Sequence, residues 1–259
     1  MSAAERDLNR AAEALAGARA VSVLTGAGIS AESGVPTFRA EDGLWEQYRI
    51  EDVATPEAVE RNPAGVWEFY ERRRATMARV EPNAGHHALA RMESRFGEWT
   101  LVTQNIDGLH QRAGSTRVLE IHGSLWRARC RRGCGGVADP FPHPAPSLPP
   151  PCECGDILRP DVVLFGEVLP SDIFEAATLG AARSQVALSV GTSSAVWPAA
   201  GIPLVAAQSG AVTIEVNPEE TELTARFDIS LRGPAGEVLP RLLERIEQIA
   251  PPRGADVTP

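Results

Sequence analysis

Short apolar runs alternate with amphipathic helical patterns along most of this 259-residue chain. The run at residues 20–25 (AVSVLT) ends in a glycine-rich turn and predicts a buried strand. Before it, Leu8, Ala11, Ala12 and Leu15 share one face of a helix. Strands that alternate with helices favour the α/β class, with a doubly wound and mostly parallel sheet. The other predicted strands are residues 100–103, 118–121, 162–165, 186–190, 212–216 and 227–231, and the other predicted helices are residues 86–96, 172–183 with Ser171 as N-cap, and 238–249.

Two segments interrupt this alternation. Residues 37–83 predict no strand, and residues 127–157 hold all four cysteines and many prolines. We interpret them as a helical insert and a zinc-binding insert that together form a smaller lobe. The larger domain then comprises residues 1–36, 84–126 and 158–250, with residues 251–259 as a disordered tail. A substrate cleft is expected between the two lobes.

The charge balance argues against some partners. No lysine occurs, and 25 arginines face 34 acidic residues, which gives a formal net charge of −9. Nucleic acids and anionic membranes need a basic face, so neither is expected as a partner. Four arginines near the cysteines are interpreted as a solvated face rather than a nucleic-acid patch: Arg127, Arg129, Arg131 and Arg132. Without a signal peptide or a membrane-spanning stretch, the predicted location is cytoplasmic.

The four cysteines are spaced like metal ligands. They form a C-x3-C pair, Cys130 and Cys134, and a C-x-C pair, Cys152 and Cys154. Four thiolates suit a tetrahedral, structural Zn²⁺ site, although the usual spacing is C-x2-C. Four free thiols or a labile disulfide is the alternative. A glycine follows the second cysteine of each pair and permits a tight turn there.

A glycine-rich turn follows the first predicted strand. Residues 26–31 (GAGISA) match the G-x-G-x-x-G/A pattern, whose glycines let a pyrophosphate approach the backbone closely. The acidic strand end that a dehydrogenase needs about 20 residues later is missing. We therefore expect a dinucleotide that is held differently from one in a hydride-transfer enzyme.

Polar residues follow two of the predicted strands. His122 comes after the strand at 118–121, where an imidazole could accept a proton at neutral pH or serve merely as a polar strand end. Asn105 and Asp107 follow the strand at 100–103. They could hydrogen-bond a carboxamide and a ribose, or could form an Asx-type turn.

One arginine is placed unusually on a predicted helix. Asn62 is a good N-cap for a helix over residues 63–77, on which Val66, Tyr70, Arg73 and Met77 share a face. An arginine within an apolar stripe needs an anionic partner, and a neighbouring phenol could share it. The partner is either a ligand carboxylate or an Asp or Glu of this chain. Arg72 and Arg74 point elsewhere and are predicted to be solvated.

Several motifs together resemble one known family. They occur in family order over roughly residues 20–240: GAGIS (26–30), GVPTFR (34–39), TQNIDGLH (103–110), HGS (122–124), FGE (165–167), GTSSAVWPA (191–199) and VNPE (216–219). The chain resembles the sirtuins, NAD-dependent protein-lysine deacylases with a Rossmann-type domain and a small zinc-bearing lobe. The resemblance implies NAD and zinc as cofactors and acyl-lysine proteins or peptides as partners.

The resemblance also implies roles for individual residues. His122 would deprotonate a ribose hydroxyl of NAD while the acyl group moves from lysine to ADP-ribose and nicotinamide leaves, with Asn105 as its catalytic partner. The implied cofactor-binding residues are Gly26, Ala27, Gly28, Ser30, Phe38, Arg39, Gln104, Asn105, Ile106, Asp107, Gly191, Thr192, Ser193, Asn217, Pro218, Glu219 and Ala235. The implied peptide-binding edge consists of Val163, Phe165, Gly166 and Glu167.

The acyl preference follows from a further resemblance. Tyr70 and Arg73 match the Tyr-x-x-Arg pair of the class III, desuccinylase-type sirtuins of bacterial-like sequence, and Ala54 matches their small pocket residue. Removal of succinyl, malonyl or glutaryl groups is therefore expected, with weaker deacetylation. A plain deacetylase, a mono-ADP-ribosyltransferase and a non-catalytic NAD sensor or zinc module are the alternatives.

Overall fold

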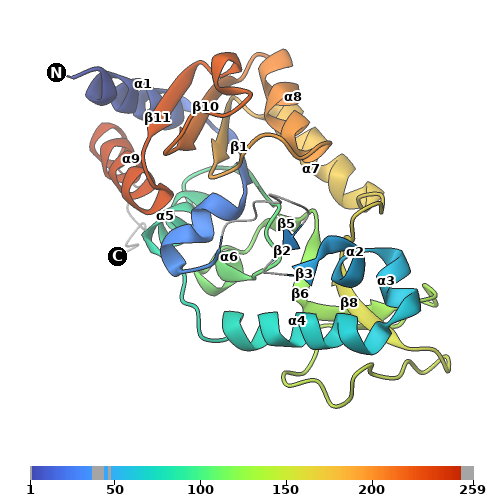
Figure 1. The fold of residues 1–259 in the computed structure, drawn as a ribbon. Helices are drawn as coiled ribbons and strands as arrows, with labels where there is room; N and C mark the ends of the chain where they lie inside the picture. Colours follow the sequence, from blue (N-terminus) through green and yellow to red (C-terminus); the bar gives the residue numbers. More distant parts are fainter. Residues whose placement is uncertain (1, 37–43, 46–47, 252–259) are drawn as a thin grey trace, which may run out of the picture.

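Six of the seven strands that the sequence predicts form one sheet (Figure 1). The computed structural model describes residues 2–36, 44, 45 and 48–251. Within this part of the chain a six-stranded sheet has the order β11-β10-β9-β1-β4-β5, and every neighbouring pair is parallel. Its strands are β1 (Ala20–Thr25), β4 (Glu98–Thr103), β5 (Val118–Glu120), β9 (Val186–Val190), β10 (Val212–Asn217) and β11 (Ile229–Arg232). The predicted α/β class is confirmed.

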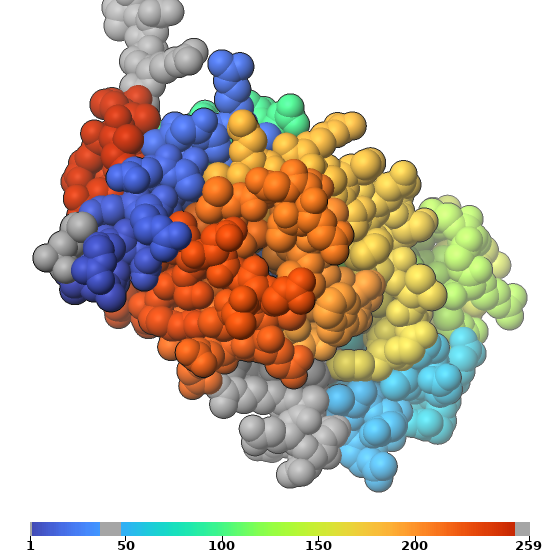
Figure 2. Space-filling view, turned by 90° about the horizontal axis from the view of Figure 1, so that it is seen from above, coloured from blue at the N-terminus to red at the C-terminus, as the bar shows by residue number. Residues whose placement is uncertain are grey.

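Helices cover both faces of this sheet. On one face lie α1 (Ala3–Gly17), α5 (Ala84–Glu93) and α9 (Ala235–Ile249), and on the other lie α7 (Ser171–Arg183) and α8 (Ile202–Gln208). Strand side chains alternate between the two layers, so Val21 and Val23 join the first core and Leu24 joins the second. The first and last helices pack side by side at one end of the molecule, blue and red in Figure 2.

Short elements complete this lobe. A 3-10 helix, η1 (Ala27–Ser33), follows β1, and α6 (Leu109–Arg112) follows β4. Two further 3-10 helices are η3 (Ala199–Gly201), before α8, and η4 (Thr224–Arg226), between β10 and β11.

The second lobe combines a helical segment with a small antiparallel sheet. Its helices are α2 (Ile50–Val53), α3 (Pro56–Arg61) and α4 (Pro63–Met77), and its sheet has the order β7-β6-β8, formed by β6 (Gly123–Cys130), β7 (Val137–Ala138) and β8 (Leu158–Val162). A separate apolar cluster joins the helices to this sheet through Val59, Phe69, Leu125 and Val162. The small sheet thus takes in residues 123–126 and 158–162 as well as the cysteine-rich segment.

Three sequence predictions are corrected here. The strand expected at residues 162–165 lies earlier, as β8, because its Arg-Pro-Asp residues pair with β6 but lack an apolar signal. Residues 37–83, expected to lack strands, contain the two-residue strands β2 (Leu44–Trp45) and β3 (Tyr48–Arg49), which are too short to leave a pattern. Pro170, rather than Ser171, is the N-cap of α7.

The start of α4 is as predicted. The Asn62 side chain accepts a hydrogen bond from the Gly65 amide at 3.1 Å, and Pro63 is the first helical residue. This cap satisfies one of the amide groups that the first helical turn leaves unpaired. It fixes where the helix begins, and therefore which residues of α4 face inward.

Removal of this cap should destabilise the protein measurably. Asn62→Ala is expected to lower the free energy of unfolding by about 1 kcal/mol, because the Gly65 amide loses its acceptor. Asn62→Asp keeps an acceptor and should stay within about 0.5 kcal/mol of the native protein. Denaturant unfolding of the three proteins measures this, and equal losses in both variants would contradict the capping role.

Candidate active site

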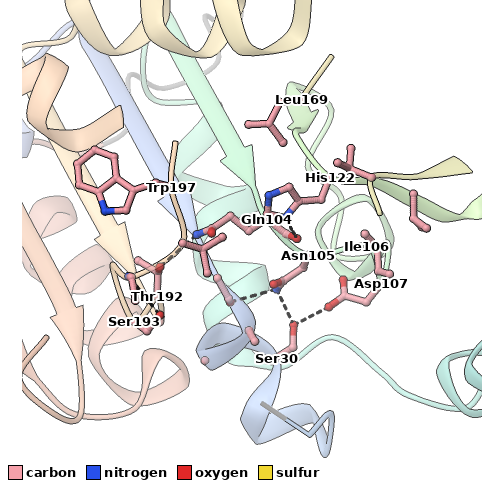
Figure 3. Close-up of a pocket in the computed structure, with 18 of the residues that line it drawn as sticks. Ser30, Gln104, Asn105, Ile106, Asp107, His122, Leu169, Thr192, Ser193 and Trp197 are labelled. Carbon is pink, nitrogen blue, oxygen red and sulfur yellow. Dashed lines mark hydrogen bonds between the residues drawn. The ribbon is translucent and has the colours of Figure 1, made fainter. Parts of the chain in front are cut away.

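A large cavity opens at the edge of the sheet where the parallel strands end. Its volume is about 1310 Å³, and its lining comes from the residues that follow β1, β4, β5 and β9 and from the end of β10. Figure 3 shows several of these side chains converging on the same space. Residues 163–169, part of α7, and part of α4 from the second lobe also line the cavity. Single small-ligand pockets usually enclose about 300–1,000 Å³, so this one has room for more than one ligand group.

The glycine-rich turn packs tightly against the turn after β9. The Gly28 amide donates to the Gly191 carbonyl at 2.7 Å, and a Cβ added at Gly28 would lie 2.7 Å from the Gly191 backbone. Gly191 itself has φ 59°, and a Cβ there would lie 2.4 Å from the Ile29 nitrogen. Side chains are therefore sterically excluded at both positions, and the bare backbone faces the cavity.

A buried serine holds two predicted cofactor-binding residues in place. The Ser30 hydroxyl donates to Asp107 Oδ2 at 2.7 Å and accepts from Asn105 Nδ2 at 3.2 Å (Figure 3). Asn105 Nδ2 also donates to the Gly26 carbonyl at 3.1 Å. Burial raises the pKa of Asp107 above its ordinary value, against the opposing hydrogen bonds from Leu109 and Ser30. These contacts fix the side-chain orientations before any ligand binds.

His122 is set up to accept a proton. Its Nδ1 lies 2.9 Å from the Gln104 carbonyl oxygen, which can only accept, so Nδ1 carries the hydrogen and Nε2 keeps its lone pair. Burial lowers the pKa of His122 below its ordinary value, although the Gln104 hydrogen bond acts in the opposite direction. The imidazole is therefore neutral at neutral pH and can act as a general base.

A second polar group lies farther along the sheet edge. Gln104 Nε2 donates to Thr192 Oγ1 at 3.1 Å, and Asn217 Nδ2 donates to the Thr192 carbonyl at 2.8 Å. The cavity lining also includes Ser193, Pro218 and Glu219. Ala235 lies at the start of α9, is 4 % exposed and does not belong to the lining. Phe38 and Arg39 fall outside the residues that the structure describes.

The predicted acyl-binding residues line the same cavity as His122. Ala54 and Tyr70 are each 1 % exposed, and Arg73 lies one helical turn beyond Tyr70 on α4. Two backbone hydrogen bonds join residues 163 and 165 to these two parts of the cavity wall: Val163 N donates to the His122 carbonyl and Phe165 N to the Ala54 carbonyl, both at 2.9 Å. The predicted peptide-binding segment therefore lies between His122 and the acyl end.

Arg74, predicted to be solvated, is instead buried. It is 1 % exposed, pairs with Glu71 at 2.9 Å and donates to the Phe141 and Pro142 carbonyls at 2.7 and 2.8 Å. These acceptors belong to the proline-rich segment, whose position the sequence pattern of α4 alone could not reveal. Arg72 is exposed and donates to the Tyr48 hydroxyl, as a surface residue would.

Sequence reasoning also assigned no role to several apolar lining residues. Val168 and Trp197 are 90 % and 61 % exposed, and Phe174 and Met77 lie deeper in the wall. Met77 shares a helix face with Arg73, and this periodicity could have indicated that Met77 also lines the cavity. Trp197 stands inside the GTSSAVWPA motif, but its side chain carried no separate signal.

The four cysteines converge as predicted. Their Sγ atoms all lie within 4.8 Å of one another, and the turns after Cys134 and Cys154 place Gly135 and Gly155 at φ 89° and 85°. Such a cluster suits Zn²⁺, whose four thiolate ligands would leave no open position for substrate. The neighbouring arginines are tied into ion pairs: Arg127 with Glu120 and Asp161, Arg129 with Asp161 and Glu167, and Arg131 and Arg132 with Asp156.

Comparisons with known proteins identify the family. The model of the Sir2 family matches residues 26–198. An NAD-dependent protein deacylase 2 of Pyrobaculum aerophilum is 50 % identical over 92 % of this chain and 95 % of its own, and an NAD-dependent protein deacylase of Aquifex aeolicus is 49 % identical over 87 % and 94 %. A Sir2 homologue–NAD complex has a TM-score of 0.86 at 43 % identity, covering 93 % of this chain and 94 % of that one. The chain belongs to the Sir2 family.

The described residues fit the cofactors of this family. Backbone at Gly26 and Gly28 leaves space where a pyrophosphate could approach, and the amide and hydroxyl groups of Asn105, Thr192 and Asn217 suit a carboxamide and ribose. The cysteine cluster supplies the donor set of a structural zinc site.

The state of His122 can be measured directly. Because burial depresses its pKa, the imidazole should titrate with a midpoint below the ordinary 6.5. NMR titration of ring-labelled histidine, assigned by comparison with His122→Gln, measures this midpoint. A midpoint at or above 6.5 would contradict the lowering of the His122 pKa by burial.

Metal content tests the cysteine cluster independently of activity. We expect about one zinc ion per chain, and Cys152→Ser should lower both the bound zinc and the Tm because one of four ligands is lost. Ser147→Ala, in the same segment but outside the cluster, is the matched control and should change neither. Elemental analysis and thermal melting report both quantities, and native-like zinc in Cys152→Ser would count against the site.

Proposed function

We propose that this chain is an NAD-dependent protein-lysine deacylase that prefers acyl groups ending in a carboxylate, such as succinyl, malonyl or glutaryl. The observation that carries the preference is the position of Arg73 and Tyr70, which line the same cavity as His122. Acetyl-lysine would be a weaker substrate. The substrate lysine must come from another molecule, because this chain contains none.

The cofactor and the residues divide the chemistry between them. When bound, NAD supplies the ADP-ribose that accepts the acyl group and releases nicotinamide. His122 Nε2 then accepts a proton from a hydroxyl placed against it, while Asn105 and Asp107, held by Ser30, orient the groups around it. The segment 163–167 is the proposed edge for an extended peptide, and because the amides of residues 163–165 already donate within the chain, its carbonyl oxygens would accept hydrogen bonds from the peptide.

The acyl end is suited to an anion. Burial, the largest influence, raises the pKa of Tyr70, so its phenol stays protonated and able to donate a hydrogen bond. Among the lining residues that the structure describes, Arg73 is the one arginine, and the other formally charged residues are carboxylates. A guanidinium and a phenol one helical turn apart can bind one carboxylate together.

The size of the pocket also supports a longer acyl group. Ala54 lines the cavity with a side chain of a single carbon and is 1 % exposed. A larger residue at this position would take up cavity volume that a longer acyl group needs. We extend the proposal to an NAD-binding large domain at residues 1–36, 84–126 and 158–250, without residues 123–126 and 158–162, which pair in the sheet of the second lobe. We also extend it to a cytoplasmic location, where reducing conditions keep four thiols available for zinc.

None of the helices that the structure describes combines the length and apolarity needed to cross a membrane.

A solved Sir2 structure with a bound myristoylated histone peptide (TM-score 0.74, 37 % identity, covering 95 % of this chain and 98 % of that one) supports acyl-peptide recognition on this fold. For the present chain, acyl-lysine proteins or peptides are the proposed partners.

The acyl preference depends on Arg73 in this proposal. Arg73→Met should lower kcat/KM for a succinyl-lysine peptide by about 30- to 150-fold, which corresponds to about 2–3 kcal/mol for a lost charge-assisted contact. Steady-state kinetics on succinyl- and acetyl-lysine versions of one peptide measure the loss. The acetyl peptide is the internal control, because Arg73 also lowers the pKa of Asp107 and its removal could affect both substrates.

A native enzyme that clearly favours the acetyl peptide, together with unchanged succinyl hydrolysis by Arg73→Met, would identify a plain deacetylase. Label from NAD that ends on protein would instead identify mono-ADP-ribosyl transfer. Both results would overturn the proposed preference.

A further inference from the structure

The carboxylate of Glu167 lines the same cavity as Tyr70 and Arg73, and it affects the proposed preference for acidic acyl groups. Its side chain belongs to the cavity wall and is 21 % exposed. Three charges act on the pKa of the Tyr70 hydroxyl: those of Arg73 and Arg159 lower it, and that of Glu167 raises it. A carboxylate bound beside Tyr70 would therefore experience all three charges.

Arg159 neutralises this carboxylate in a buried, two-pronged ion pair. Its Nη1 donates to Glu167 Oε1 and its Nη2 to Glu167 Oε2, each at 2.7 Å, and its side chain is 7 % exposed. Nη2 also donates to the Val162 carbonyl at 2.8 Å, which anchors the guanidinium to the end of β8. Bidentate pairs of this kind fix geometry as well as charge.

The remaining contacts of Glu167 hold the pair in place. Oε2 accepts from the Leu164 amide at 2.9 Å and lies 3.4 Å from Arg129 Nη2. Burial alone would raise the pKa of Glu167, but the hydrogen bonds from Arg159 and Leu164 outweigh it and the pKa is lowered. The carboxylate is thus ionised, and its charge must be balanced by the protein.

One network of ion pairs balances the charge of Glu167. Arg129 is shared with Asp161, and Arg127 pairs with Asp161 and Glu120. The network contains three arginines and three carboxylates, so its formal charges sum to zero; its members are Arg127, Arg129, Arg159, Glu120, Asp161 and Glu167. Loss of Arg159 would leave the Glu167 carboxylate, which lines the cavity, without its main partner, and the low dielectric of a partly buried site strengthens such a charge.

We propose that Arg159 is a specificity-determining positioning residue: by pairing with Glu167, it removes the repulsion that would otherwise exclude a negatively charged acyl chain from the pocket. Arg159 touches no substrate in this role. The inference rests on the proposed preference for acidic acyl groups and names the residue pair that permits it.

The test isolates charge from shape. A succinyl-lysine peptide is compared with the same peptide carrying a succinamoyl group, in which a neutral amide replaces the terminal carboxylate at nearly equal size. The quantity measured is the ratio of kcat/KM for succinyl to that for succinamoyl, in the native enzyme, Arg159→Gln, Glu167→Gln and the double variant.

Opposite shifts are expected from the two single variants. Arg159→Gln should lower the ratio by about fivefold or more, because Glu167 then repels the substrate carboxylate, and Glu167→Gln should raise it, because Arg159 becomes an unbalanced cation. The double variant should return the ratio to within about twofold of the native value. Thermal melts and Arg159→Lys, which keeps the charge, separate these effects from misfolding.

Equal losses of kcat/KM on both peptides in every variant would show that the Arg159–Glu167 pair only supports the structure of residues 162–167, and would overturn the inference. A shift of the same sign in both single variants would also overturn it. Failure of the proposed function is recognised separately, because the native ratio would then already be near one or below it.

Discussion

Everything at this site depends on the parallel arrangement of the strands. Since β1, β4, β5, β9 and β10 all run in the same direction, the residues that follow them meet at one edge, although the chain separates the first from the last by about 190 residues. Gly28 and Gly191 meet there without side chains, and Ser30 reaches across to Asp107. The hydrogen bond from His122 to the Gln104 carbonyl and the one from Asn105 to Ser30 orient both side chains before ligands arrive, which favours proton transfer.

The helix α4 connects this edge to the rest of the small lobe. On one side of α4, Tyr70 and Arg73 line the cavity. On the other side, Arg74 donates hydrogen bonds to carbonyls of the proline-rich segment. Glu71 completes the second contact: it pairs with Arg74 and lies 2.6 Å from His143 Nδ1. The position of Tyr70 and Arg73, the proposed acyl-binding residues, is therefore linked to the proline-rich segment between the two cysteine pairs.

The sequence predicts the large lobe well, because β1 and β9 are short, mostly apolar runs in which every residue is buried, and this leaves a clear signal. It also predicts α4 and its cap. It fails where long-range charge decides the structure: β8 contains Arg159 and Asp161, whose ion pairs come from β6 and residue 167, so no apolar pattern marks it. Arg74 is misjudged for the same reason, since its acceptors lie about 67 residues away.

The central claim is that Arg73 and Tyr70 receive the carboxylate of an acyl group whose lysine lies against His122. A crystal structure with a bound succinyl-lysine peptide tests it most directly. The account predicts that the succinyl carboxylate lies within about 3 Å of the Arg73 guanidinium and the Tyr70 hydroxyl. A carboxylate directed to solvent, with Arg73 turned to a carboxylate of its own chain, would contradict it.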